Sequence, residues 1–199
     1  MAEQKLLVAA DEYLKAGLHI GTKFRTKFME PFIYKVRNDS LAVLNVQKIN
    51  ERIELAAKFL SEYSPDEILV ICRRENGYKA VKEFSEATGI KSIVGRYPPG
   101  MLTNPKLETF TETKLLLAAD PWPDKNAVKD AVSTGIPIIA LCDTNNESNF
   151  IDLMVPCNNK GKKSLALLFW ILAREYLKNR KIIKKDSDFK KTVDDFTME

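Results

Sequence analysis

The residues of this chain that could do chemistry are chiefly cations in expected loops. Residues 21–28, Gly-Thr-Lys-Phe-Arg-Thr-Lys-Phe, alternate Lys23, Arg25 and Lys27 with hydroxyl and aromatic side chains. Cations neutralise phosphate groups, while aromatic rings stack on unpaired bases or anchor a loop to the core. This stretch is therefore the clearest candidate in the sequence for contact with a polyanion.

Other cations lie at the ends of expected elements. Arg73 and Arg74 follow the apolar run at residues 68–72, and Arg96 begins the stiff turn Arg-Tyr-Pro-Pro-Gly. Residues 158–164, Asn-Asn-Lys-Gly-Lys-Lys-Ser, open an apolar helix, and the free N–H groups at a helix start favour a phosphate. Each segment also fits a capped or solvated surface, so each signal is weak by itself.

The net charge of +4 hides an uneven distribution. Residues 15–37 hold six basic side chains against one acidic one, and residues 158–185 hold nine against one. Such windows can form a patch that attracts polyanions, or two separate solvated faces. Charge alone leaves both interpretations open.

Nucleotide enzymes leave fingerprints that this sequence lacks. No Gly-x-Gly-x-x-Gly follows an expected strand, which disfavours a dinucleotide site. Residues 161–164, Gly-Lys-Lys-Ser, resemble part of a P-loop, but Pro156 stands where that motif needs glycine, and Lys163 where it needs a hydroxyl. His19 is the only histidine, and there is no Gly-x-Ser-x-Gly elbow. For His19 we expect a structural role or an RNA contact.

Two aspartates could bind a metal. Asp120 and Asp143 each follow an expected buried strand, where the active sites of parallel sheets gather. Both positions are also typical of turn residues, whose short polar side chains satisfy loop backbone groups. We favour the turn interpretation. Zinc is disfavoured because the three cysteines show no Cys-x-x-Cys spacing. Cys72 and Cys142 lie in apolar runs, so buried thiols are their simplest interpretation, consistent with a reducing compartment.

The elements that must position these residues alternate between helix and strand. Apolar runs predict strands near residues 32–36, 41–44, 68–72, 92–94, 115–119, 136–141 and 153–155. Helical spacing predicts helices near residues 6–14, 49–60, 80–87, 127–132 and 164–177. This alternation predicts a three-layer α/β/α sandwich with a mainly parallel central sheet of the Rossmann or flavodoxin-like kind.

We expect one α/β domain over residues 1–179, with an N-terminal helix and a basic loop at 18–31. Residues 180–199 are charged and poor in apolar side chains, so we expect a mobile tail. The longest apolar run, Leu165 to Ala173, is nine residues, against roughly 20 for a membrane span. We therefore expect a soluble protein without a signal peptide or membrane partner.

A series of ordered motifs resembles the universal ribosomal protein S-two family. Residues 16–21 resemble its Ala-Gly-x-His-x-Gly signature, and residues 155–161 its (Ile/Val)-Pro-Cys-Asn-Asn-Lys-Gly segment. The matching blocks are residues 16–21, 31–35, 44–48, 95–104, 136–144, 151–152, 155–161 and 172–175. They run in order from about Tyr13 to Asn179, nearly the whole chain, and are far more specific than any single motif.

The resemblance implies a structural constituent of the small ribosomal subunit that supports assembly and translation in the cytoplasm. It implies contacts with small-subunit rRNA and neighbouring ribosomal proteins, and no catalysis, cofactor, metal or small-molecule substrate. About ten residues separate Asn104 from Leu115, so the coiled-coil insertion of bacterial members is absent. No acidic, Trp-containing extension like that of the eukaryotic relative, protein SA or laminin-receptor precursor, follows residue 179. An archaeal-type member fits best.

Charge and expected loop position, guided by the family's RNA-binding role, indicate the phosphate contacts. They are Lys23, Arg25, Lys27, Arg37, Arg73, Arg74, Arg96, Lys160, Lys162 and Lys163. Two other classes stay open. One is a metal- or nucleotide-dependent enzyme that uses Asp120 and Asp143, and the other is an adaptor that binds only proteins.

Overall fold

The computed structural model describes residues 6–198. Its central sheet has the strand order β4-β3-β5-β6-β7, and every neighbouring pair is parallel. The strands are β3 (Ile68–Cys72), β4 (Lys91–Val94), β5 (Leu115–Ala118), β6 (Ile138–Cys142) and β7 (Leu153–Pro156). Every residue of β3, β5 and β6 is buried, as their unbroken apolar runs predict for strands covered on both faces.

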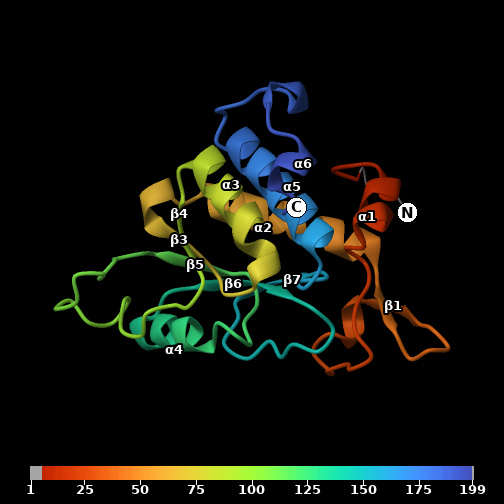
Figure 1. Cartoon of the computed structure of the whole chain (residues 1–199), viewed down its shortest axis with the longest axis horizontal. Helices are drawn as coiled ribbons and strands as arrows, with labels where there is room; N and C mark the ends of the chain where they lie inside the picture. Colours follow the sequence, from red (N-terminus) through yellow and green to blue (C-terminus); the bar gives the residue numbers. More distant parts are fainter. Residues whose placement is uncertain (1–5, 199) are drawn as a thin grey trace.

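Helices cover both faces of this sheet. One face carries α2 (Val46–Ser61), α3 (Tyr78–Thr88) and α5 (Lys162–Asn179), while α4 (Lys125–Thr134) lies on the other (Figure 1). Asn45 caps α2 by accepting from the N–H groups of Gln47 and Lys48, and Gly89 and Gly135 end α3 and α4 in the left-handed conformation. The predicted three-layer α/β/α sandwich is confirmed.

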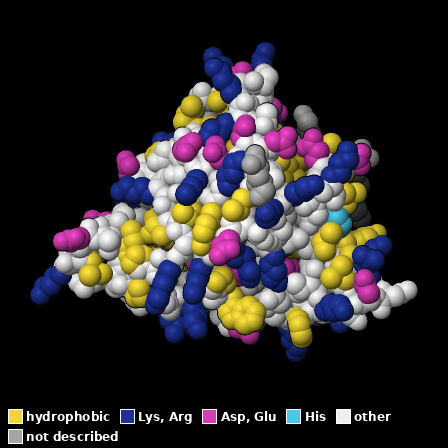
Figure 2. All heavy atoms as spheres, viewed as in Figure 1, with side chains coloured by type: hydrophobic (Ala, Val, Ile, Leu, Met, Phe, Trp, Pro, Cys, Tyr) yellow, Lys and Arg dark blue, Asp and Glu magenta, His cyan; other side chains and the backbone are white. Residues whose placement is uncertain are grey.

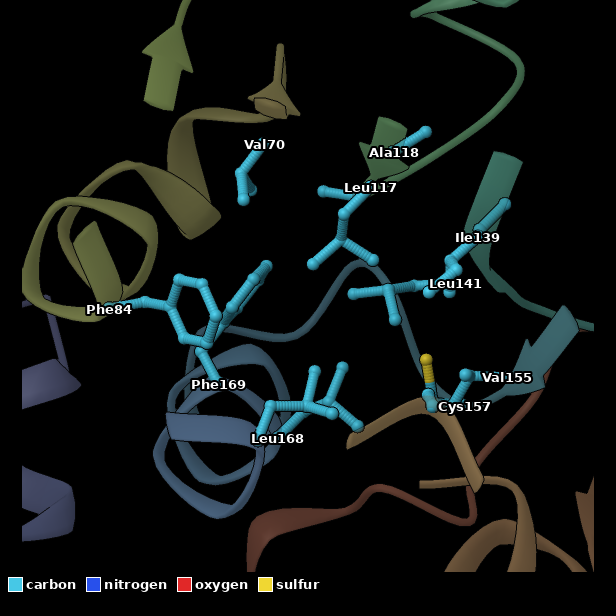
Figure 3. Packing of buried hydrophobic residues seen from close by; sticks show 14 of the residues in the cluster. Val70, Phe84, Leu117, Ala118, Ile139, Leu141, Val155, Cys157, Leu168 and Phe169 are labelled. Atoms are coloured by element: carbon cyan, nitrogen blue, oxygen red, sulfur yellow. The ribbon is translucent and has the colours of Figure 1, made fainter. Parts of the chain in front are cut away.

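The core lies between the sheet and α5. Figure 3 shows Leu168 and Phe169 of α5 directed toward Leu117 and Leu141 of the sheet. Phe169 also meets Phe84 of α3 edge to face, with ring centroids 5.6 Å apart. Because α2, α3 and the sheet enclose α5, this helix is apolar around most of its circumference.

A small antiparallel hairpin stands beside the main sheet. The helix α1 (Ala10–Ala16) ends at Gly17, and β1 (Ile33–Val36) pairs with β2 (Ala42–Leu44). Figure 1 shows this hairpin projecting from the body of the molecule. The segment that joins α1 to the hairpin is the predicted basic loop, and its residue Ile20 forms a single bridge to Val43.

The C-terminal segment differs from the expected mobile tail, because the structure places it against the domain. Its short helix α6 (Val193–Phe196) contacts α3 and α5, and Phe196 is only 1% exposed. Trp170 Nε1 also donates to the carbonyl of Lys191 at 2.8 Å. Scattered apolar residues in a charged segment gave little periodic signal. Mobility of this segment stays a prediction, but these contacts oppose it.

Within residues 6–198, no helix combines the length and the apolar character that crossing a membrane requires.

Candidate nucleic-acid interface

The carboxyl ends of the five parallel strands meet at one edge of the sheet, and most of the predicted site residues lie there. In chain order within the sheet, the strands follow the arrangement 2-1-3-4-5, so the order reverses between β3 and β5. Sheets of this kind bind ligands in the crevice at such a reversal. Arg73 and Arg74 follow β3, and Asp120 follows β5, which brings these residues to that point.

The protein fills this crevice with its own side chains. Arg74 Nε donates to Asp120 Oδ2 at 2.5 Å, and Asp120 is 1% exposed. The other oxygen, Asp120 Oδ1, accepts from Asn146 Nδ2 at 3.1 Å and from the main-chain N–H of Trp122 at 3.1 Å. Asn159 Nδ2 in turn donates to Asn146 Oδ1 at 3.1 Å. The network satisfies the buried carboxylate where a ligand would otherwise sit.

A second internal ion pair lies farther along the same edge. Lys160 Nζ donates to Asp143 Oδ2 and to Asn145 Oδ1, both at 2.9 Å. Asp143 also accepts from the N–H of Thr144 at 2.6 Å, which agrees with the turn interpretation of this aspartate. Lys160 and Arg74 were both predicted phosphate contacts. Their charges are already balanced by buried carboxylates, which weakens both as contacts to an external anion.

Asp124 is a third buried carboxyl at this edge. It directly precedes α4, but its side chain makes no capping hydrogen bond, and its Oδ2 has no partner among residues 6–198. Burial raises the pKa of Asp124 to about 7, and the nearby Asp120 also raises it, against hydrogen bonds from the main chain of Arg73 and Asp120.

The basic loop is fastened to the loop that follows β6. The N–H of Thr22 donates to Thr144 Oγ1 at 2.8 Å, and the N–H of Thr26 donates to the carbonyl of Thr144 at 3.0 Å. Thr26 Oγ1 also donates to the carbonyl of Asn146 at 2.8 Å. At Gly21 a Cβ would lie only 2.4 Å from Thr144 Cγ2, so this close approach requires glycine. Backbone contacts thus hold the loop in place.

With the backbone of the loop held by these contacts, the cationic side chains of the loop face solvent. Lys23, Arg25 and Lys27 are all exposed, whereas Met29 is fully buried and ties the end of the loop to the core. Alternation of anchoring threonines with exposed cations explains the sequence pattern. The structure thus brings three predicted phosphate contacts together on one fixed segment.

The remaining predicted contacts divide into two places. Arg73 and Arg96 follow β3 and β4, and Lys162 and Lys163 begin α5, so these four exposed residues surround the carboxyl edge of the sheet. Arg37 lies apart, in the hairpin, 3.7 Å from Asp39. Figure 2 shows many Lys and Arg side chains over the lower part of the molecule, where Figure 1 places α4.

Sequence reasoning missed two exposed cations of α4. Lys125 and Lys129 are exposed, lie four residues apart on α4, and make no ion pair with any residue in 6–198. Their i, i+4 spacing was a usable signal, since it places both on one face of a helix. Sequence reasoning also counted one cation too many for the surface. Arg174 was counted in the basic window at residues 158–185, but it is buried and pairs with Glu175 at 2.9 Å.

Groups suited to catalysis are buried or engaged. All three cysteines are free and buried, as expected for Cys72 and Cys142, and burial raises the pKa of Cys72 to about 12. His19 Nδ1 is buried without a hydrogen-bond partner in the described part of the chain. Residues 6–198 hold no group of three or more His, Cys, Asp or Glu side chains arranged for a metal.

Fold and site together define a class of protein: a parallel α/β sandwich whose ligand crevice is closed by internal ion pairs, while the surrounding loops present cations. The profile of the family described as Ribosomal protein S2 matches residues 13–112 and 107–178. The chain belongs to the ribosomal protein S2 family, and it is of the archaeal type.

Its relatives cover nearly the whole of this chain. The chain is 49% identical to the small ribosomal subunit protein uS2 of Picrophilus torridus over 199 residues, all of both chains. It is 53% identical to uS2 of Nanoarchaeum equitans over 96% of this chain and 94% of that protein. It is also 50% identical to uS2 of Saccharolobus solfataricus over 98% of this chain and 84% of that protein.

Proposed function

We propose that this protein is a structural constituent of the small ribosomal subunit. It binds small-subunit rRNA and neighbouring ribosomal proteins in the cytoplasm, and so supports subunit assembly and translation. Family membership and relatives that are named small ribosomal subunit protein uS2 support this proposal. In this role the protein works by binding and needs neither a cofactor nor a small-molecule substrate.

The observation that carries the RNA contact is the fixed basic loop. Thr22 and Thr26 hold its backbone against Thr144 and Asn146, and its cations face solvent. Ordering a loop before binding lowers the entropy lost when it meets a partner. Phosphate contacts from such a loop set the position and orientation of the protein on RNA, largely without reading sequence.

Binding is favoured over the enzyme alternative by the state of the two candidate aspartates. Asp120 pairs with Arg74, and Asp143 pairs with Lys160. A catalytic metal needs carboxylate oxygens that face an open position. Both carboxylates instead bind cations of the protein itself and stabilise the loops at the carboxyl edge of the sheet.

Protein neighbours fit the projecting hairpin better than RNA does. Tyr34 and Val36 are exposed on β1. The exposed Leu14 lines the same hollow as Tyr34, and the exposed Ile20 forms a bridge to Val43 of the hairpin. Exposed apolar side chains of this kind are typical of protein interaction surfaces. The hairpin can therefore bind a protein neighbour on the ribosome, so protein binding accompanies RNA binding in this role and does not replace it.

Salt dependence tests the RNA contact. Replacing Lys23, Arg25 and Lys27 together by alanine should weaken binding to small-subunit rRNA and flatten the plot of log affinity against log salt. Each lost phosphate contact lowers the slope by about 0.7 to 0.9, so the triple variant should lose about 2 to 3.

A matched control removes three exposed lysines elsewhere. Lys58, Lys82 and Lys91 lie on α2, on α3 and at the start of β4. Their replacement should leave the slope within about one contact of wild type. Equal slopes for wild type and the Lys23, Arg25 and Lys27 variant would remove the basic loop from the interface.

A further inference from the structure

The surface has a groove that is lined by none of the predicted phosphate contacts. It lies between the loop that precedes α4 and the loop that follows β6, and its volume is about 470 Å³. That size lies within the range of small-molecule pockets, roughly 300–1,000 Å³. Two large aromatic side chains line it, Trp122 from one loop and Phe150 from the other.

Both rings are unusually exposed for their type. Trp122 is 67% exposed and Phe150 is 70% exposed, although aromatic side chains gain most from burial. Phe150 also has a φ of 64°, a left-handed conformation that costs a residue other than glycine roughly 1–3 kcal/mol. Two exposed aromatic rings and a strained backbone therefore occur together at one groove, a combination typical of a binding site.

The main chain around the exposed Trp122 is held in place on both sides. Pro121 and Pro123 flank it and fix their own φ angles. The main-chain N–H of Trp122 donates to Asp120 Oδ1 at 3.1 Å, and Arg73 Nη1 donates to the carbonyl of Pro123 at 3.3 Å. The Arg74–Asp120 network therefore fixes the backbone of a projecting tryptophan, as well as filling the crevice.

The polar lining of the groove indicates the chemistry of the partner. Lys125 and Lys129 of α4 border it and make no ion pair within residues 6–198, against a single carboxylate, Glu147, in the lining. Asn145 and Asn149 also line it. Asn145 Oδ1 accepts from Lys160 and Asn149 Nδ2 donates to Glu147, so Asn145 Nδ2 and Asn149 Oδ1 are the donor and the acceptor that can face a ligand. A cationic groove with amides and two aromatic rings is complementary to a nucleotide, whose base stacks and whose phosphate is anionic.

Position links this groove to the basic loop. The loop at residues 145–150 forms one wall of the groove, and Thr26 of the basic loop donates to the carbonyl of Asn146 in that wall. A strand whose phosphates follow Lys23 to Lys27 thus passes beside the groove.

We propose that the groove between Trp122 and Phe150 binds an unpaired nucleobase of an RNA strand, with Lys125 and Lys129 on its phosphates. The inference rests on the proposed RNA-binding function and adds a class of target, single-stranded rather than fully paired RNA. A base within a duplex is already stacked and cannot enter.

Fluorescence titration of the intact protein tests this site. The probes are a ten-nucleotide oligoadenylate and an RNA duplex of the same length, at fixed salt. Oligoadenylate should quench the tryptophan fluorescence of the wild type. Trp122→Ala should abolish most of this quenching and weaken the affinity for oligoadenylate about tenfold or more, with duplex affinity unchanged. Trp122→Phe should restore most of the affinity.

Phe150→Gly gives a second variant that protects the test against misfolding. Glycine adopts a φ of 64° readily, so this change removes the ring without straining the fold. It should weaken oligoadenylate binding severalfold. Leu55→Ala, which removes an exposed apolar side chain of α2 outside the lining of the groove, should bind as wild type.

The outcomes separate this site from the proposed function. Unchanged oligoadenylate affinity in both Trp122→Ala and Phe150→Gly would overturn the base site, even if the Lys23, Arg25 and Lys27 variant still loses RNA affinity. Normal RNA binding by Trp122→Ala, with poor incorporation into the small subunit, would assign the groove to a protein partner and also overturn it. Unchanged RNA binding by every variant would remove both the basic loop and the groove from the interface. Failure of the wild type itself to bind small-subunit rRNA would contradict the proposed function.

Discussion

Arg74 and Asp120 form an ion pair at the point where the strand order of the sheet reverses, with Arg74 Nε 2.5 Å from Asp120 Oδ2. The neighbouring Arg73 is exposed instead, and its side chain donates to the carbonyl of Pro123 at 3.3 Å. Two adjacent arginines therefore have different tasks. One closes the crevice, and the other remains available to a phosphate.

Alanine substitution separates these tasks. Arg74→Ala leaves the buried Asp120 without its cation, and we expect a loss of about 3 kcal/mol in the free energy of unfolding. This lies at the low end for buried pairs because the Arg74 side chain is 30% exposed. Arg73→Ala should cost under ~0.5 kcal/mol but weaken rRNA binding. Denaturant unfolding and filter binding measure the two effects.

Removal of both charges is the control for the ion pair. The double variant Arg74→Met with Asp120→Asn should recover most of the stability lost in Arg74→Ala, because no buried charge is left unpaired. If Arg73→Ala and Arg74→Ala destabilise the protein equally, the crevice network has no special structural role.

Asp124 should make stability depend on pH. Burial raises its pKa from 3.8 to about 7, so the folded protein binds this proton more tightly than the unfolded chain does. The contribution of Asp124 to the free energy of unfolding is therefore greatest below about pH 4. It falls as the pH rises to about 7 and changes no further above that. Each pKa unit corresponds to about 1.4 kcal/mol, which makes the full effect a few kcal/mol.

Asp124→Asn tests this by removing the titrating group. The variant should match the wild type near pH 4 and exceed its free energy of unfolding by roughly 2–4 kcal/mol at pH 8, measured by urea unfolding at both pH values. A difference between the two proteins that does not change with pH would show that Asp124 has an ordinary pKa.

Phe196 decides whether the C-terminal segment is packed or mobile. The side chain is fully buried against the domain, so Phe196→Ala should cost about 3 kcal/mol if the segment is packed in solution. Met198→Ala is the control, since Met198 is partly exposed in the same segment. Thermal unfolding and hydrogen exchange at residues 180–198 would measure the effect. Equal stability of both variants would support the mobile tail expected from the sequence.

Much of the fold could be predicted from local pattern. The run Ile68 to Cys72 became a strand buried on both faces, as predicted, and three of the helices end at glycines 17, 89 and 135, close to the ends expected from their spacing. These features depend on nearby residues, so periodicity and turn chemistry suffice. The packing of Phe196 could not be predicted, because it depends on contacts with α3 and α5 far back in the chain.

The site was less predictable for the same reason. Charge and loop position identified the basic loop, but Arg73 and Arg74 are alike in sequence, and only the fold shows that Asp120, 46 residues away, pairs with one of them. The groove between Trp122 and Phe150 joins two loops that no local motif connects. Local rules find cations, whereas tertiary contacts decide which remain exposed.

Cosedimentation with small ribosomal subunits through a sucrose gradient at high salt tests the central claim most directly. High salt removes proteins held only by non-specific charge, since such binding falls steeply with ionic strength. The account predicts near-stoichiometric recovery of the protein in the small-subunit peak. Recovery only at the top of the gradient would contradict it.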